Sequence, residues 1–205
     1  MPPSRRLVLA SASPARVGLL RAAGFAPEVV VSGVDEEAVA GEADPDEAVP
    51  ELVERLARAK AEAVAARPEA AGAIVIGCDS LFELDGEVQG KPGSAARATE
   101  RIRAQRGRTG VLHTGHCVID QARERCASAV RSTAVTFGQM DDEEVDAYVA
   151  TGEPLSVAGA FTLDGRSAVF VDHIEGDPSN VIGLSLPELR NLLGAIDVQV
   201  TELWA

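Results

Sequence analysis

Apolar residues follow two different periods along this chain, and each period predicts one kind of element. Residues 46–67 carry them at spacings of three and four, which predicts a long amphipathic helix. Its apolar face consists of Val49, Leu52, Val53, Leu56, Ala63 and Val64. Unbroken apolar runs at 6–10 and 73–78 instead predict strands, and the second is typical of a central strand buried on both faces.

Prolines and glycines set the expected ends of the helices. Ser13 and Pro14 are a natural N-cap and first helical residue, and Gly24 ends that helix. An Asp-Pro pair at 44–45 is expected to begin the long helix, and an Arg-Pro pair at 67–68 to end it. Further helices are expected at residues 94–105, 141–150 and 187–193.

The remaining patterns predict a sheet. Asp85 and Gly86 indicate a tight hairpin between strands at 81–84 and 87–89. Long strands at 111–120 and 127–137 are joined by a polar turn and are expected to pair antiparallel. Other strands are expected at 29–32, 168–174 and 198–203, and irregular segments at 34–47 and 152–165. This order predicts one α/β domain over residues 1–205, with a mixed sheet of long central strands and flanking helices.

Two cations interrupt the apolar faces of the expected helices. Lys60 lies in the middle of the apolar face of the long helix, and Arg16 shares the apolar stripe of the helix after Pro14. An inward charge is costly unless an opposite charge meets it. The partner could be an internal carboxylate or an anionic ligand such as a phosphate, and long side chains can also snorkel to the surface.

Composition restricts the class of partner. The chain has 205 residues, 46% of them hydrophobic, and a net charge of -13. Such an acidic chain does not suit a nucleic-acid polymer or an anionic membrane, although a few cations in a cleft can still bind one small phosphorylated ligand. The apolar run after Arg5 and Arg6 is too short for a signal peptide, and no segment reaches bilayer length. We expect a cytoplasmic protein with no membrane partner.

The cysteines and histidines do not suggest a metal or disulfide framework. Cys78, Cys117 and Cys126 are an odd number without C-x-x-C spacing, so reduced, buried thiols are expected. His113 and His116 face opposite ways if they lie in one strand, and a joint metal site is therefore not expected.

Other polar residues lie where a phosphate or a metal could bind. Ser11, Ser13 and Arg16 surround a predicted helix N-terminus, which attracts anions. Lys91 lies between Gly90 and Pro92, and this pinned backbone suits a lysine aimed at a phosphate. No phosphate-binding glycine motif of the known kinds is present.

Acidic residues follow two of the predicted strands. Asp79 is expected just past the carboxyl end of the buried strand, where open α/β sheets place ligands. A carboxylate there could hold Mg²⁺ or accept a proton from water, or it could be a turn residue. The acidic group at 35–37, which includes Glu36, could supply a second metal ligand or could be a solvated loop.

An ordered series of motifs resembles the Maf family of nucleoside triphosphate pyrophosphatases, also called septum formation proteins. The motifs are LASASPAR at 9–16, VDE at 34–36, LARAKA at 56–61, VIGCDS at 75–80, LDGEVQGKP at 84–92, GEP at 152–154, AGAF at 158–161 and GDPSNVIGL at 176–184. They span nearly the whole chain. The resemblance implies a Maf/ITPase-like α/β fold with two lobes around a central cleft, and favours a homodimer.

The resemblance also implies an activity. A nucleoside triphosphate would be hydrolysed at its α–β phosphoanhydride to the monophosphate and pyrophosphate, with a divalent cation, Mg²⁺ or Mn²⁺, as cofactor. Phosphate-binding roles are implied for Ser11, Ser13, Arg16, Lys60 and Lys91. Asp79 is implied as proton acceptor or metal ligand, and Glu36 as a residue near the metal.

Several positions depart from the family pattern. Ala15 replaces the first of two common arginines, residues 156–157 are Ser-Val in place of Asp-Lys, and Asp164 replaces a glutamine. These changes leave the base preference open. They also keep an alternative from another class, a non-catalytic nucleotide-binding regulator of cell division or septum formation.

Overall fold

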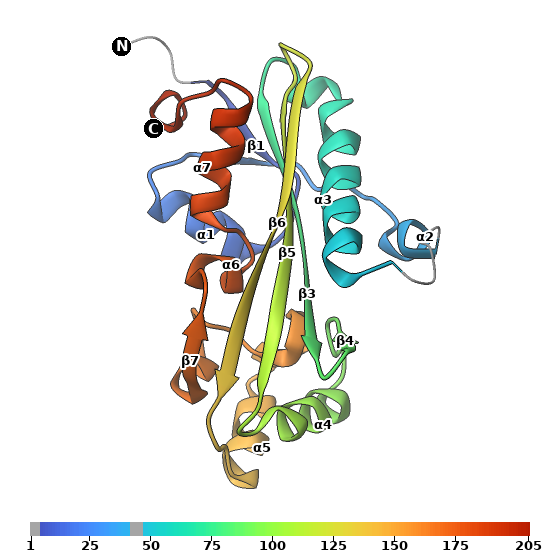
Figure 1. Ribbon diagram of the computed structural model, residues 1–205, viewed down its shortest axis with the longest axis vertical. Coiled ribbons are helices and arrows are strands. Elements are labelled where there is room, and N and C mark those ends of the chain that lie inside the picture. Colours follow the sequence, from blue (N-terminus) through green and yellow to red (C-terminus); the bar gives the residue numbers. More distant parts are fainter. Residues whose placement is uncertain (1–4, 42–46) are drawn as a thin grey trace.

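Long antiparallel strands form the spine of the molecule. The computed structural model describes residues 5–41 and 47–205, and Figure 1 shows β3, β5 and β6 running along its longest axis. The strands are β1 Leu7–Leu9, β2 Glu28–Val29, β3 Ile74–Leu84, β4 Glu87–Gln89, β5 Thr109–Asp120, β6 Arg125–Phe137 and β7 Val171–Glu175. They form one sheet in the order β2-β1-β3-β5-β6-β7, with β4 also paired to β3. Since β1 runs parallel to β2 and β3 and the other pairs are antiparallel, the predicted mixed sheet is confirmed.

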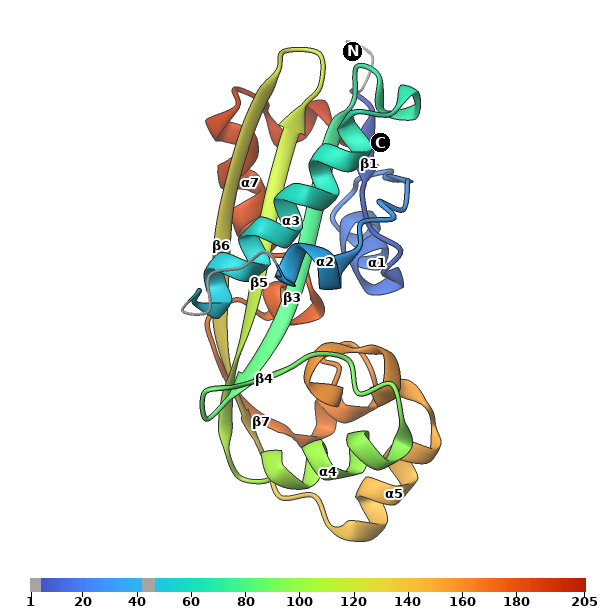
Figure 2. The ribbon, with the colours of Figure 1, turned by 90° about the vertical axis from the view of Figure 1, so that its right-hand side faces the viewer.

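Helices cover both faces of the upper sheet and build a separate lower lobe (Figures 1 and 2). One face carries α2 Glu36–Gly41 and α3 Val49–Ala65, and the other carries α1 Pro14–Ala22, α6 Pro178–Ile182 and α7 Leu186–Ala195. The lower lobe contains α4 Ala95–Gln105 and α5 Asp142–Ala150. Short 3₁₀ turns connect the elements, at Pro68–Ala70, Glu153–Ser156, Ala158–Ala160, Arg166–Phe170 and Val200–Glu202.

Each lobe has its own apolar interior. In the upper lobe, even-numbered residues of β3 such as Ile76 pack towards α1 and α7, and odd-numbered ones such as Val75 pack towards α3. In the lower lobe Phe82, Phe137 and Phe161 meet edge to face, with ring centroids 4.9–5.8 Å apart. The two-lobed arrangement expected from the family resemblance is thus present, with β3, β5 and β6 continuing through both lobes.

Two glycines let α3 approach the sheet very closely. A Cβ on Gly77 of β3 would lie 2.2 Å from the carbonyl oxygen of Ala57, and one on Gly115 of β5 would lie 2.0 Å from that of Val53. Neither distance is compatible with a side chain, so the two strands present bare backbone to the helix. Asp79 pairs directly with Gly115, and therefore points to this same face.

Two local expectations are wrong, and a third is right only in part. Residues 34–47 were expected to be irregular but include helix α2, whose first turn holds Glu36 and Glu37. Residues 198–203 form a 3₁₀ turn at Val200–Glu202 in place of a strand, and the amide of Gln199 donates to the side chain of Glu202 there. Residues 168–174 divide into a 3₁₀ turn and strand β7.

The expected ends of several elements also shift. The long helix begins at Val49, with Pro50 in its first turn, and the start predicted at 44–45 lies outside the described residues. Strand β2 is limited to Glu28–Val29, and α6 was not predicted. Among the described residues, none of the helices combines the length and apolar character that crossing a bilayer requires.

Candidate active site

The candidate residues gather where one edge of β3 lacks a neighbouring strand. Along this edge β1 pairs with residues 74–76 and β4 with residues 82–84, whereas β5 pairs with the opposite edge from Ile74 to Glu83. Residues 77–81 therefore lie in a notch between β1 and β4. Asp79 lies in this notch, in the middle of a continuous strand and not past its end as the sequence predicted. The two predicted strands at 73–78 and 81–84 are one because β5 pairs with both.

Lys60 joins two carboxylates at the notch. It is 7% exposed, and its Nζ lies 2.6 Å from Oδ1 of Asp79 and 2.7 Å from Oε1 of Glu36. Lys60 comes from α3, Asp79 from β3 and Glu36 from the first turn of α2. The sequence had left open an internal carboxylate or an anionic ligand as the partner of Lys60, and the structure shows two carboxylates in contact with it, of which Asp79 is buried.

The two carboxylates have different acidities. Burial raises the pKa of Asp79 above its usual value, against the opposing effect of the nearby Lys60 ammonium. Burial acts in the same direction on Glu36, but its hydrogen bond to Lys60 and the charges of Lys60, Lys91 and Arg16 outweigh it and lower the pKa of Glu36. Asp79 is thus the better proton acceptor of the two once it is ionised.

Arg16 is held by neutral acceptors on the other side of β3. Its guanidinium donates to Oγ of Ser11 at 3.0 Å, to the carbonyl oxygen of Cys78 at 2.9 Å and to Oγ of Ser80 at 3.0 Å. Its Nε donates to the carbonyl oxygen of Gly183 at 2.7 Å. One side chain thereby ties α1, the open edge of β3 and the turn after α6 together.

The two serines of the first motif lie around the start of α1. Ser13 is the N-cap, and its Oγ accepts a hydrogen bond from the amide of Arg16. Ser11 is buried, and its Oγ accepts from the amide of Ser13 at 3.2 Å as well as from Arg16. The two hydroxyls therefore shape the loop between β1 and α1.

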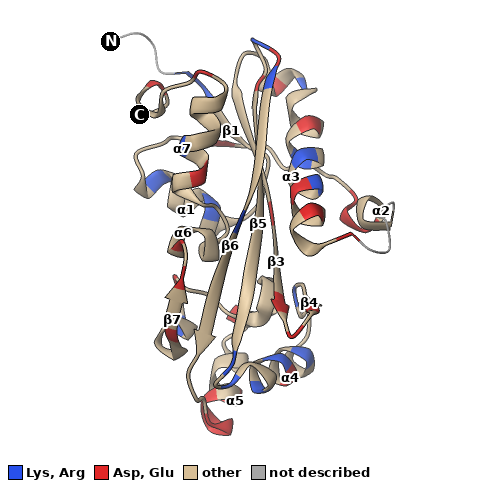
Figure 3. Ribbon diagram, in the orientation of Figure 1, with Lys and Arg blue, Asp and Glu red and all other residues tan. Residues whose placement is uncertain are grey.

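Lys91 approaches the site from the lower lobe. It is exposed, in the connection between β4 and α4, and its charge contributes to the lowered pKa of Glu36. Among the described residues, the structure thus brings Lys60, Asp79 and Glu36 into contact, places Arg16 with Ser11, and leaves Lys91 to act through its charge. Lys and Arg are elsewhere interspersed with Asp and Glu along α3 and α4 (Figure 3).

A buried polar chain behind Arg16 was not predicted from the sequence. Oγ of Ser80 lies 2.9 Å from Oγ1 of Thr114, which in turn donates to the backbone oxygen of Asn180 at 3.3 Å. Asn180 is fully buried, and its amide donates to the carbonyl oxygens of Leu112 and Arg131. The sequence signal was weak, since Thr114 is simply one polar residue inside an apolar strand.

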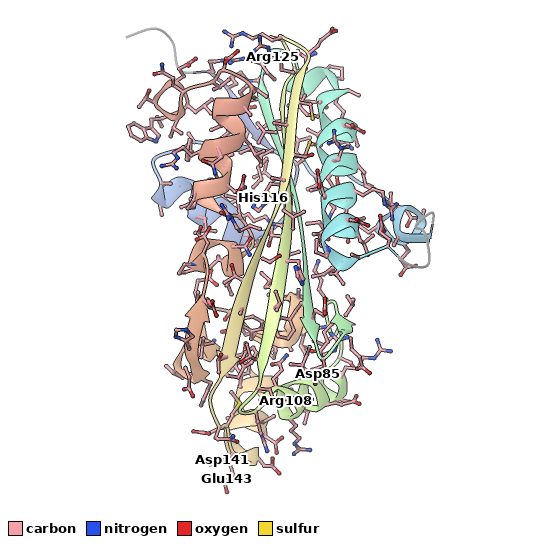
Figure 4. All side chains as sticks on the ribbon, in the orientation of Figure 1. Asp85, Arg108, His116, Arg125, Asp141 and Glu143 are labelled. Atoms are coloured by element: carbon pink, nitrogen blue, oxygen red, sulfur yellow. The ribbon has the colours of Figure 1, made fainter. Side chains whose placement is uncertain are left out.

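The histidines are separate, as predicted, and one prediction about the cysteines is wrong. Nε2 of His116 accepts a hydrogen bond from the amide of Ser185, and burial lowers its pKa to about 4. It lies midway along the long strands (Figure 4), whereas His113 contacts Ser132 through Nδ1. Cys78 and Cys117 are buried, but Cys126 is exposed because it lies near the tip of the β5–β6 hairpin.

The donors around Lys60 are of the kind that a hard divalent cation takes. Mg²⁺ is typically bound through one or two carboxylates together with substrate phosphates and water. Lys60 contacts one oxygen of Asp79 and one of Glu36, so both carboxylates are directed to a common point and each has a second oxygen. No cluster of three or more His, Cys, Asp or Glu ligands occurs within residues 5–41 and 47–205. The two carboxylates therefore fit a divalent cation whose other ligands are substrate phosphates and water.

The chain is similar to known proteins over nearly its whole length. A relative in Streptomyces coelicolor named nucleoside triphosphate pyrophosphatase is 63% identical, over 99% of this chain and 96% of its own length. Relatives of the same name in Streptomyces avermitilis and Nocardia farcinica are 60% and 56% identical, each over at least 96% of both chains. The family model described as Maf-like protein matches residues 6–196, and the chain therefore belongs to the Maf family.

Proposed function

We propose that the protein hydrolyses the α–β phosphoanhydride of a nucleoside triphosphate and releases the monophosphate and pyrophosphate. The observation that carries this proposal is Lys60 held between Asp79 and Glu36 at the open edge of β3. Cations and carboxylates at one point suit a polyphosphate and the water that attacks it. The names of the relatives support the same activity.

In this mechanism Asp79 accepts the proton of the attacking water. Its buried position raises its pKa, which makes the ionised carboxylate a stronger base than an exposed aspartate. Lys60 can exchange a carboxylate for a phosphate oxygen, because Glu36 is 53% exposed and can move away. Lys91 and the N-terminus of α1 add positive potential around the phosphates.

A divalent cation, Mg²⁺ or Mn²⁺, is proposed as cofactor. Asp79 and Glu36 would hold it, and when bound it supplies further neutralisation of the phosphate charge. Lys60, which contacts one oxygen of each carboxylate, would bind a phosphate oxygen beside them. Arg16 is proposed to position Ser11 and Ser80 around this site, because its hydrogen bonds reach both side chains.

The base end of the nucleotide is proposed to lie against Asp164. This residue lines a hollow between α1 and α6 together with Ala15, Leu19 and Ile182. An ionised carboxylate only accepts hydrogen bonds, which favours bases with an amino or imino donor, cytidine nucleotides included. The ranking of bases by kcat/KM should therefore change in Asp164→Gln, and an unchanged ranking would remove Asp164 from base recognition.

The deciding experiment is product analysis. The protein is incubated with a panel of nucleoside triphosphates and Mg²⁺, Mn²⁺ or chelator, and the products are separated by chromatography. We expect pyrophosphate and a monophosphate from at least one nucleotide, only with metal. Orthophosphate as the first product would contradict the proposal, and binding with no product from any nucleotide would favour the non-catalytic regulator. Light scattering in the same buffer tests the proposed homodimer, and fractionation of cells tests the cytoplasmic location.

A further inference from the structure

Two thiols lie in contact on the sheet face that α3 covers. Sγ of Cys117 and Sγ of Cys126 are 3.6 Å apart. Cys117 pairs with Ser128 and Ile119 pairs with Cys126 in the β5–β6 ladder, so the two cysteines are diagonal neighbours on one face. Cys78 faces the other side of the sheet, where it belongs to the core beneath α7, and cannot join them.

The two thiols differ in accessibility in the way that a redox pair requires. Cys126 is exposed and Cys117 is buried. An oxidant in solution can reach the first sulfur, whereas the second is protected from solvent and already in contact with its partner. A disulfide needs the sulfurs about 2.05 Å apart, so they must approach by roughly 1.5 Å.

A cation lies beside the exposed thiol. Nη1 of Arg58 on α3 is 3.4 Å from Sγ of Cys126, and its Nη2 donates to Oγ of Ser128 at 2.6 Å. The contact with Ser128 fixes the guanidinium next to the sulfur. A positive charge there stabilises the negative charge that a thiol carries when it attacks an oxidant.

We propose that Cys117 and Cys126 are a modification site, at which a hydroperoxide converts the two thiols into a reversible disulfide. Sulfur of Cys126 attacks the peroxide oxygen, the O–O bond breaks, and the leaving oxygen departs as water or an alcohol. Cys126 is then a sulfenic acid. Sulfur of Cys117 attacks it, the S–S bond forms, the S–O bond breaks, and hydroxide leaves with the proton of Cys117 as water.

The position in the hairpin makes this disulfide easy to reverse. Diagonal neighbours start farther apart than directly opposite residues, so the bond must draw the first residues of β6 towards β5. Arg125, the residue before Cys126, marks the tip of the hairpin, far from the lower lobe that holds Asp141 (Figure 4). Strained and exposed disulfides are the readily reduced ones, so the bond is a transient state in a reducing compartment.

Peptide mapping of the intact protein tests the proposal. The folded protein is treated with hydrogen peroxide, free thiols are alkylated, and tryptic peptides are analysed without reduction. Because Arg123 and Arg125 lie between the cysteines, peptides 109–123 and 126–131 separate unless a disulfide links them. We expect the linked pair and its loss after dithiothreitol. Sulfinic acid on Cys126 together with fully alkylated Cys117 would overturn the proposal.

Variants separate the roles of the two sulfurs and the cation. Cys117→Ser should stop linkage and drive Cys126 to sulfinic acid, and Cys126→Ser should leave Cys117 unoxidised. Arg58→Gln should slow linkage severalfold, with Arg21→Gln on the exposed side of α1 as the matched control. Equal rates of linkage in the wild type, Arg58→Gln and Arg21→Gln would show that Arg58 is not part of the site. Linkage that joins Cys78 instead would overturn the assignment.

Discussion

In the sequence, Lys60 and Arg16 are both cations inside the apolar stripe of a helix. In the structure, they contact different kinds of group. Both interrupt the apolar stripe of a helix, and both are less than 10% exposed. Lys60 meets two carboxylates, of which Glu36 is 53% exposed. Arg16 instead meets hydroxyl and carbonyl oxygens, two of them on β3 and one on the turn after α6.

The two sets of partners differ in how readily they could be exchanged for a ligand. The partners of Lys60 are side chains, and one lies on a short surface helix, which suits the proposal that a phosphate takes the place of a carboxylate. The partners of Arg16 include backbone carbonyl oxygens that cannot move without distorting the strand. Arginine suits these contacts because its donors point in fixed directions, whereas the lysine ammonium can turn between partners.

The largest expected effect comes from changing Asp79, the buried carboxylate that Lys60 contacts. Asp79→Asn removes the proposed proton acceptor with almost no change in shape, and should lower kcat at least about a hundredfold. Circular dichroism and thermal unfolding should show an intact fold. Asp85→Asn, in the exposed turn after β3 (Figure 4), is the matched control and should keep normal activity. Near-normal turnover in folded Asp79→Asn would exclude Asp79 from the mechanism.

The second prediction compares the two cations by stability. Arg16→Met leaves several buried oxygens without donors, and should lower the free energy of unfolding by about 3 kcal/mol. Lys60→Met should also destabilise at pH 7, because it leaves the Asp79 carboxylate buried without its ammonium.

A double variant shows whether the two losses differ in kind. In Lys60→Met/Asp79→Asn the buried charge is gone, so this double variant should recover most of the stability that Lys60→Met loses. Denaturant titration measures the recovery. Arg16→Met has no single carboxylate partner to remove, and Arg16→Met/Asp79→Asn should recover none. Equal recovery in the two double variants would show that Arg16 and Lys60 are not distinct.

The third prediction concerns pH. Asp79 must be ionised to accept a proton, and its pKa is raised by burial. As the pH is lowered, kcat/KM should therefore begin to fall at a higher pH than an ordinary aspartate would give. Lys60→Gln should move this fall to still higher pH, because Lys60 lowers the pKa of Asp79. The contribution of Asp79 to stability should fall as activity rises with pH. A raised pKa favours the folded state at low pH, and this contribution is lost as the pH rises through the pKa of Asp79 in the folded protein. An acid limb that stays in place in Lys60→Gln would contradict the assignment.

The smallest expected effect separates a local role of Ser13 from its place near the site. Ser13 caps α1 and Ser94 caps α4, each through a hydrogen bond from an amide at 3.4 Å. Ser13→Ala and Ser94→Ala should each lower the free energy of unfolding by about 1 kcal/mol. If Ser13 lies beside the phosphates, only Ser13→Ala should also raise KM, and equal KM values would leave it a cap alone.

Most of the elements of this protein, and its unusual side chains, can be predicted from local sequence. The long helix, the hairpin at Asp85 and Gly86 and the antiparallel pair of long strands follow from local periodicity and turn chemistry. Lys60 and Arg16 were noticeable because a charge inside an apolar stripe conflicts with that periodicity.

The contacts of those side chains depend on how distant parts of the chain pack together. The two strand signals around Asp79 merged because β5 pairs with both, and Asp79 reaches Lys60 because Gly77 and Gly115 allow α3 to lie against bare backbone. The helix that brings Glu36 to Lys60 is short and acidic, and its sequence alone resembled a loop. The reason is physical: periodicity reports which face of an element is buried, whereas the partner on that face depends on residues far away in the chain.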